Sequence, residues 1–283
     1  MDSTSIEART VGVTAADGAT SELMLVGAPV AGRWVYWLPA MGVPARSYLP
    51  LAQALAARGI AVALHEWRGI GSSDRRAGRR RNWGYHALLH DDLPAGLAAA
   101  RTVWPEAAGY LGGHSLGGQL AGVFAGSHPM GVAGVVLVAS GAPYWKRFRH
   151  AWPIGAAYVA APMLARLLGY FPGRRIGFGG NEARGVIRDW ARSGRTGRYA
   201  AAGMGDLEAG MAAFAGPVLA VRLRDDWLGP AASLDWLLGK LPRADVTREV
   251  LTPDELGGPA DHFGWMKAPG PVAARIAHWL ARH

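Results

Sequence analysis

The centre of this 283-residue sequence is Tyr110-Leu111-Gly112-Gly113-His114-Ser115-Leu116-Gly117-Gly118-Gln119. It contains Gly-x-Ser-x-Gly, between an apolar segment, Ala107 to Leu111, and a helix-like segment, Leu116 to Ser127. A serine on a sharp strand-to-helix turn has a strained backbone, and flanking glycines remove side chains that would collide with it. The chain has 40 glycines, so the pattern alone could be a glycine-rich turn. Its context favours a nucleophile elbow that exposes the Ser115 hydroxyl.

Apolar runs of strand length alternate with helix-like segments on both sides of this stretch. Such alternation predicts an α/β fold in which helices flank a mostly parallel central sheet. The predicted strands are near Arg9–Val13, Glu22–Val26, Arg33–Leu38, Ile60–Leu64, Ala107–Leu111, Val132–Ala139, Pro217–Leu223 and Asp245–Leu251. The predicted helices are Ser47–Arg58, Trp83–Val103, Leu116–Ser127, Ala231–Leu238 and Val272–Ala281.

The alternation stops after the strand that ends near Ala139. Residues 141–215 contain no clear strand, and their helix-like pieces lie at about Ile154–Leu168 and Ala183–Arg192. We therefore predict that residues 141–215 form a helical cap, or lid. Residues 1–140 and 216–283 would form the core.

An acid and a histidine follow Ser115 in the chain order that a fold with a nucleophile elbow requires. Asp225 and Asp226 come directly after the predicted strand Pro217–Leu223, and active-site groups of open α/β sheets lie at such strand ends. His262 lies in a glycine-rich loop beyond one more strand. The order Ser, Asp, His predicts a catalytic triad. The simpler interpretations are that the aspartate only caps a turn or helix and that His262 is an ordinary surface residue.

An oxyanion hole needs two N–H donors that point at the developing negative charge. The residue after the nucleophile, Leu116, is one predicted donor. The second should come from the loop after Arg33–Leu38, which reads Pro39-Ala40-Met41-Gly42-Val43-Pro44. Met41 is our choice, and it could also simply line the pocket. His114 lies beside the nucleophile and is expected to be structural.

With these motifs in place, the chain resembles an α/β hydrolase over nearly its whole length. More narrowly, it is similar to a bacterial set of predicted α/β hydrolases related to the serine aminopeptidase and monoacylglycerol lipase-like group. The resemblance rests on Pro39 to Pro44, Trp67-Arg68-Gly69-Ile70-Gly71-Ser72-Ser73, Gly113 to Gln119, Asp225-Asp226 with Pro230, and Gly264 after His262-Phe263.

The resemblance implies that the acid is the aspartate four residues before the proline, which is Asp226. It also has departures. Pro39-Ala40 stands where His-Gly is common, and His65-Glu66 stands where Phe-Asp is common. Neither departure removes a member of the triad.

We expect a serine hydrolase that cleaves a carboxylic ester, or a thioester, through an acyl-enzyme on Ser115. The alternatives are an acyltransferase or cyclase-like enzyme with the same triad, and a catalytically silent binding protein on the same scaffold. The expected partner is a small-molecule acyl substrate. We find no motif for a cofactor, a metal ion or a nucleic acid.

Cysteine is absent, and Met1 to Glu7 lacks the apolar core of a signal peptide, so we expect a cytoplasmic protein. The segment from Ala151 to Tyr170 is the best candidate for a membrane span. Pro153, Pro162 and Arg166 interrupt it, so no spanning helix is expected.

The formal net charge is +9, and the basic residues concentrate in two places. Residues 141–215 hold Lys146, Arg147, Arg149, Arg166, Arg174, Arg175, Arg184, Arg188, Arg192, Arg195 and Arg198 against Glu182, Asp189, Asp206 and Glu208. The second group is Arg68, Arg75, Arg76, Arg79, Arg80 and Arg81. If both groups rim the cleft, the substrate would carry an anionic group, whereas the simpler interpretation is a solvated basic surface.

Overall fold

The structure is a computed structural model that describes residues 7–128 and 131–283. The expectation for Met1 to Ile6 lies outside the described residues.

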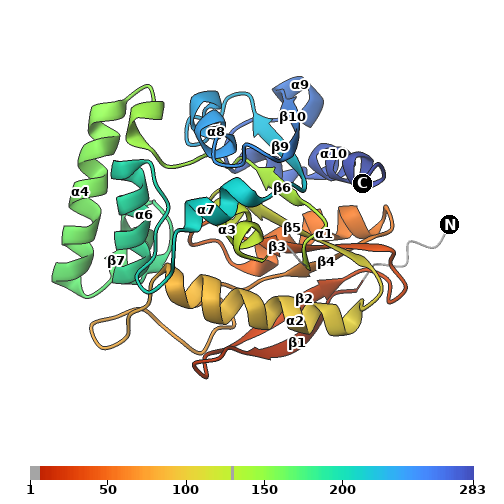
Figure 1. The fold of residues 1–283 in the computed structure, drawn as a ribbon, viewed down its shortest axis with the longest axis horizontal. Coiled ribbons are helices and arrows are strands. Elements are labelled where there is room, and N and C mark those ends of the chain that lie inside the picture. Colours follow the sequence, from red (N-terminus) through yellow and green to blue (C-terminus); the bar gives the residue numbers. More distant parts are fainter. Residues whose placement is uncertain (1–6, 129–130) are drawn as a thin grey trace.

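An eight-stranded sheet forms the centre of the molecule (Figure 1). Its spatial order is β1 (Arg9–Thr14), β2 (Thr20–Val26), β4 (Ile60–Leu64), β3 (Arg33–Leu38), β5 (Ala108–His114), β6 (Val135–Val138), β9 (Pro217–Leu223) and β10 (Asp245–Leu251). β1 and β2 pair antiparallel, as do β2 and β4, and every other pair is parallel. The mostly parallel sheet predicted from the sequence is confirmed.

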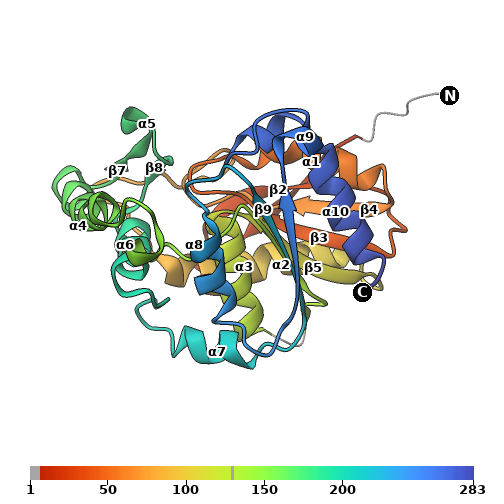
Figure 2. The ribbon, with the colours of Figure 1, turned by 90° about the horizontal axis from the view of Figure 1, so that it is seen from above.

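Helices cover both faces of this sheet (Figure 2). One face packs against α1 (Leu49–Ala56) and α10 (Gly270–Leu280), and the other against α2 (Leu93–Val103), α3 (Leu116–Ser127) and α8 (Ala231–Leu238). Alternate residues of β3 pack against the helices on opposite faces of the sheet, because successive side chains along a strand point to opposite faces. Trp34 and Tyr36 belong to the α2–α3 layer, and Val35 and Trp37 to the α1–α10 layer.

Two predicted helices begin differently in the structure. A 3₁₀ turn, Ala45–Tyr48, precedes α1, and a π-helical turn, Ala87–Asp92, precedes α2. Pro94 lies in the first turn of α2 and has no N–H with which to extend an α-helical ladder backwards. Short helical turns at α9 (Pro253–Leu256) and Gly264–Lys267 complete the core.

The segment between β6 and β9 begins with a 3₁₀ turn at Trp145–Arg147 and is mainly helical. Its elements are α4 (Ala151–Leu168), β7 (Phe171–Pro172), α5 (Gly173–Ile176), β8 (Asn181–Glu182), α6 (Arg184–Thr196) and α7 (Leu207–Ala213). α4, α5 and α6 lie beyond one end of the core (Figure 2), whereas α7 packs against α3. β7 and β8 pair antiparallel over two residues each, so the expectation of no strand here is wrong. The predicted domain boundaries stay a prediction.

α4 runs unbroken through its prolines and includes the helix-like piece predicted at about Ile154–Leu168. Pro153 lies in the first turn, where its missing N–H costs nothing. Pro162 lies inside the helix and leaves the Tyr158 carbonyl without its helical donor, but Arg195 Nη1 of α6 donates to that oxygen at 2.6 Å. By length and composition, α4 is the one described helix that could cross a membrane, with a mean hydropathy of 1.2 and 17% of that stretch buried.

Candidate active site

Ser115 occupies the sharp turn between β5 and α3. Its backbone has φ 54° and ψ −118°, a conformation that side chains disfavour. Ser115 N–H donates to Val138 O at 3.1 Å, and Ser115 O accepts from Gln119 N and from the Ser140 hydroxyl, both at 3.1 Å. Neighbouring elements on both sides therefore hold the strained serine in place.

The glycines flanking Ser115 are required by close packing. A Cβ at Gly113 would lie 2.3 Å from the Gly117 carbonyl carbon, and one at Gly117 would lie 2.0 Å from Leu38 O. Both distances are far below van der Waals contact. The geometry is that of a nucleophile elbow rather than of an ordinary glycine-rich turn.

Asp226 and His262 form a buried pair. Asp226 follows the end of β9, and His262 lies further along the chain, after β10. Asp226 Oδ2 and His262 Nδ1 lie 2.8 Å apart, and the Asp226 side chain is fully buried. Asp226 Oδ1 accepts from the N–H groups of Leu228 and Gly229, both at 2.9 Å. These two bonds fix the carboxylate, which in turn orients the imidazole.

Asp225 has different surroundings. Its side chain is 51% exposed, and its carboxylate faces Arg224 Nε at 3.2 Å. The main chain thus directs the two adjacent carboxylates to opposite environments, and only Asp226 reaches His262.

His262 lies beside the elbow. Its ring centroid is 4.8 Å from that of His114, the residue before Ser115. No hydrogen bond from the Ser115 hydroxyl to His262 occurs within the described part of the chain. Catalytic hydrogen bonds are commonly long before substrate binds and tighten in the complex.

The loop after β3 lies against the start of α3. A Cβ at Gly117 would lie 2.0 Å from Leu38 O and 2.6 Å from Pro39 O, so the first turn of α3 packs closely against this loop. Trp67 Nε1–H donates to Pro39 O at 2.7 Å, and Ala40 N–H donates to the Tyr48 oxygen at 2.9 Å. The hydrogen bonds within residues 7–128 and 131–283 include none donated by the backbone N–H of Met41 or of Leu116.

Tyr48 connects this loop to the elbow. Because its oxygen accepts the Ala40 N–H, its hydroxyl proton is directed to His114 Nδ1 at 2.8 Å. Burial lowers the pKa of His114 well below its usual range, with His262 adding a smaller effect, so the ring is neutral and can accept this bond. In the sequence, Tyr48 falls within the predicted helix Ser47–Arg58, and this role was not predicted for it. An aromatic residue shortly after the loop was the only available signal.

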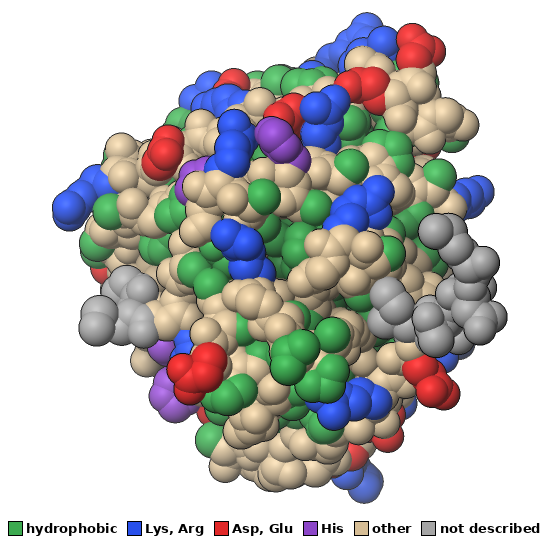
Figure 3. All heavy atoms as spheres, turned by 90° about the vertical axis from the view of Figure 1, so that its right-hand side faces the viewer, with side chains coloured by type: hydrophobic (Ala, Val, Ile, Leu, Met, Phe, Trp, Pro, Cys, Tyr) green, Lys and Arg blue, Asp and Glu red, His purple; other side chains and the backbone are tan. Residues whose placement is uncertain are grey.

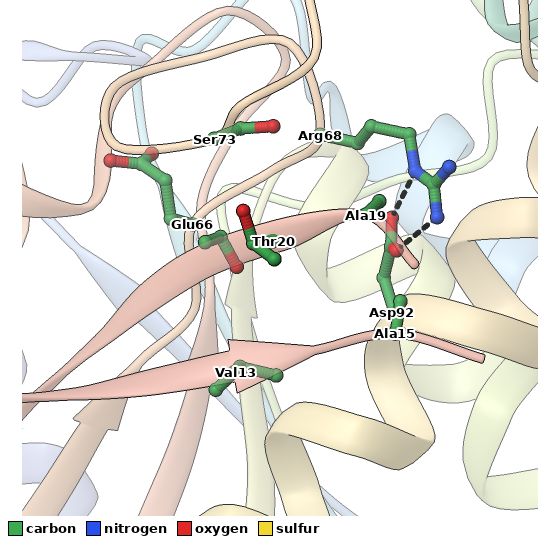
Figure 4. A pocket seen from close by; sticks show the side chains of 9 residues that line it. Val13, Ala15, Ala19, Thr20, Glu66, Arg68, Ser73 and Asp92 are labelled. Carbon is green, nitrogen blue, oxygen red and sulfur yellow. Dashed lines mark hydrogen bonds and ion pairs between the residues drawn. The ribbon is translucent and has the colours of Figure 1, made fainter. Parts of the chain in front are cut away.

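Arg68 does not face a substrate cleft. Its side chain is 5% exposed and pairs with Asp92, at 3.0 Å from Nε and 2.5 Å from Nη2 (Figure 4). It also pairs with Asp17, at 2.5 Å from Nη1. The Arg68 guanidinium lowers the pKa of Asp17. The expectation that Arg68 contributes to a basic rim is therefore wrong, because the two carboxylates already use its donors.

A loop of the predicted cap rests on the loop after β3, residues 39–44. A Cβ on Gly42 would lie 2.0 Å from the Gly180 nitrogen, so the two backbones are in direct contact. Gly180 N–H donates to the buried Glu182 carboxylate at 2.9 Å. Burial raises the pKa of Glu182, whereas the Gly180 N–H bond and the Arg174 charge lower it. The net result is a pKa of about 7.

One group of described side chains offers several possible metal ligands. The ligand atoms of His86, His90 and Asp91 lie within 4.8 Å of one another. However, the two imidazoles stack with 25° between their planes, so their in-plane lone pairs run alongside each other rather than converging. His90 Nδ1 also already contacts Asp91 Oδ1 at 3.0 Å. This arrangement does not suit one ion.

The fold and this site define the chain as an α/β hydrolase. Residues 33–252 match the hydrolase family described as serine aminopeptidase, S33, and the chain belongs to that family. No curated protein matches the sequence.

Several solved structures share the fold at low sequence identity. An esterase of Pyrococcus furiosus is 16% identical with a TM-score of 0.64, over 98% of this chain and 92% of its own. An esterase of Thermogutta terrifontis is 17% identical with a TM-score of 0.64, over 97% and 98%. A monoacylglycerol lipase of Paleococcus ferrophilus is 16% identical with a TM-score of 0.59, over 98% and 99%. The chain is therefore a hydrolase whose fold is shared with esterases and lipases.

Proposed function

We propose that this hydrolase cleaves carboxylic esters through an acyl-enzyme on Ser115. The observation that carries the proposal is the buried Asp226–His262 pair beside a serine held at positive φ. Structural relatives named as esterases and as a monoacylglycerol lipase support an ester as the bond that is broken. A thioester would react by the same steps.

The chemistry follows from the surroundings of each group. His262 Nε2 takes the Ser115 proton as the hydroxyl oxygen attacks the acyl carbon, and then protonates the leaving alcohol. Asp226 holds the imidazole by Nδ1 and stabilises its positive charge. The N–H groups of Met41 and Leu116 stabilise the tetrahedral oxyanion. Water, activated by His262, then releases the acid.

The same triad could transfer the acyl group to an alcohol or amine instead of water. Product analysis of a turnover mixture containing an added alcohol separates these outcomes. The acid alone indicates hydrolysis, whereas a new ester indicates transfer. A silent binding protein would form neither product.

The assignment of Ser115 is tested with a fluorophosphonate probe and a panel of acyl esters. Ser115→Ala should lose labelling and roughly 10⁴- to 10⁶-fold in kcat, the usual effect of removing a triad member. Ser127→Ala is the matched control, because Ser127 is exposed at the far end of α3, and it should label normally. Labelling that survives in a folded Ser115→Ala protein would exclude Ser115 as the nucleophile.

A further inference from the structure

The outer face of α4 is apolar and exposed. Trp152, Val159, Met163 and Leu167 recur at helical spacing and are 79%, 51%, 62% and 74% exposed, with exposed Ala156 between them. The helix spans about 27 Å at 1.5 Å per residue. Contiguous apolar surface of this kind on a soluble domain marks an interaction site.

The opposite face of α4 belongs to the protein interior. Tyr158 and Ala165 are buried, and Ala165 packs in a small core with Phe171 and Ile187. Arg195 of α6 also binds the Tyr158 carbonyl. α4 therefore lies on the protein with one face covered, at the edge of the molecule in Figure 1, so that it cannot be surrounded by lipid as a spanning helix would be.

The charged side chains of the segment that contains α4 are all positive. Residues 141–181 contain no Asp or Glu. Exposed Lys146, Arg147 and Arg149 precede α4, exposed Arg166 lies near its C-terminal end, and exposed Arg174 and Arg175 follow it. The backbone of Arg79 contacts Gly169 at the end of α4, which adds the exposed Arg79–Arg81 stretch. By contrast, the face shown in Figure 3 carries acidic and basic side chains interspersed.

We propose that α4 and its flanking basic residues bind the surface of an anionic lipid bilayer. Helices that lie in the membrane interface combine Trp and Leu on one side with Lys and Arg around it, and each basic residue near an anionic surface strengthens binding. A second copy of the chain fits less well. In a two-fold dimer the same patch faces itself, so these basic groups would be brought together without an acid in residues 141–181 to offset them.

Docking at this surface is independent of the catalytic proposal, because none of these residues belongs to the site. It also assigns the basic residues of the cap to a lipid headgroup surface instead of to the substrate. A protein of the cytoplasm, the compartment we propose, would meet such a surface at the anionic inner leaflet.

The experiment is co-sedimentation of the full chain with two kinds of vesicle. One is phosphatidylcholine alone, and the other contains roughly a third phosphatidylglycerol. The wild type should bind the anionic vesicles, and added salt should weaken binding. Met163→Glu/Leu167→Glu should reduce binding at least about tenfold, because it puts two charges into the interfacial face. Val30→Glu/Val250→Glu, at exposed apolar positions elsewhere, should bind as the wild type does.

A second pair of variants tests the charges. Arg174→Gln/Arg175→Gln should weaken binding roughly tenfold or more, whereas Arg9→Gln/Arg282→Gln removes the same net charge elsewhere and should have little effect. Unchanged unfolding temperatures show that each variant is folded. The proposal is overturned if the wild type binds neither vesicle, or if each control weakens binding as much as its partner. It is also overturned if Met163→Glu/Leu167→Glu abolishes a dimer while no vesicle binding occurs.

Discussion

Asp225 and Asp226 are neighbours in the chain but differ in every property that a triad acid needs. Asp226 is buried, accepts two main-chain N–H bonds and contacts His262, whereas Asp225 is half exposed and faces Arg224. A buried acceptor of this kind selects the imidazole tautomer whose Nε2 can take a proton.

Asp226→Asn should reduce kcat roughly 10⁴-fold, because an amide can favour the wrong imidazole tautomer. Asp225→Asn is the matched variant and should change kcat at most a few-fold, since its carboxylate does not reach His262. Steady-state kinetics on one ester, with unfolding curves for both proteins, make the measurement. A greater loss in Asp225→Asn would mean that the acid is misassigned.

At the level of elements, a hydrogen bond from Arg195 of α6 to the Tyr158 carbonyl of α4 replaces the helical bond that Pro162 cannot donate. Pro162 cannot donate to the Tyr158 carbonyl, and Arg195 supplies the donor instead. This explains how an apolar helix with an internal proline stays continuous.

Arg195→Met should destabilise the protein by about 1 kcal/mol, because it leaves that partly buried carbonyl without a partner. In a Pro162→Ala background the same change should cost clearly less, since an alanine at this position restores the helical N–H. Chemical unfolding of the four proteins in this cycle measures the coupling, and Arg192→Met, exposed on the same helix, is the control. Equal losses in both backgrounds would show that the Tyr158 carbonyl does not depend on Arg195.

On the scale of the whole molecule, the predicted cap and the core meet at Gly180 and Gly42, in the loop after β3. Glu182 closes this contact from the cap side by accepting the Gly180 N–H. Its burial raises its pKa to about 7, from 4.5 in the unfolded chain. The folded state therefore holds the Glu182 proton over a pH range in which the unfolded state has released it.

A raised folded pKa gives stability that is complete below pH 4.5 and is lost as the pH rises through about 7. Glu182→Gln keeps a hydrogen-bond acceptor but cannot ionise. Its free energy of unfolding should therefore fall less between pH 4.5 and pH 8 than that of the wild type, and the difference should be up to roughly 3 kcal/mol. Melting temperatures from pH 4.5 to pH 8 test this, with Glu106→Gln, exposed before β5, as the control. Parallel pH profiles for the wild type and Glu182→Gln would contradict it.

Local sequence determined the order of the core strands and helices, because alternating apolar segments and glycine placement act over a few residues. It also determined the spacing around Ser115 and the order in which Ser115, Asp226 and His262 follow one another. These features depend on backbone sterics and on the order of the strands along the chain. Neither requires information about which distant residues come into contact.

Tertiary structure alone decided the partners of Arg68, the burial of Glu182 and the covered side of α4. Arg68 contacts Asp17 and Asp92, which are 51 and 24 residues away, so it is a structural ion pair and not a substrate ligand. α4 is apolar on nearly every side, so its sequence could not show which side α6 covers and which side stays exposed. Burial and electrostatics depend on what packs against a group, and for Arg68, Glu182 and α4 those partners come from distant parts of the chain.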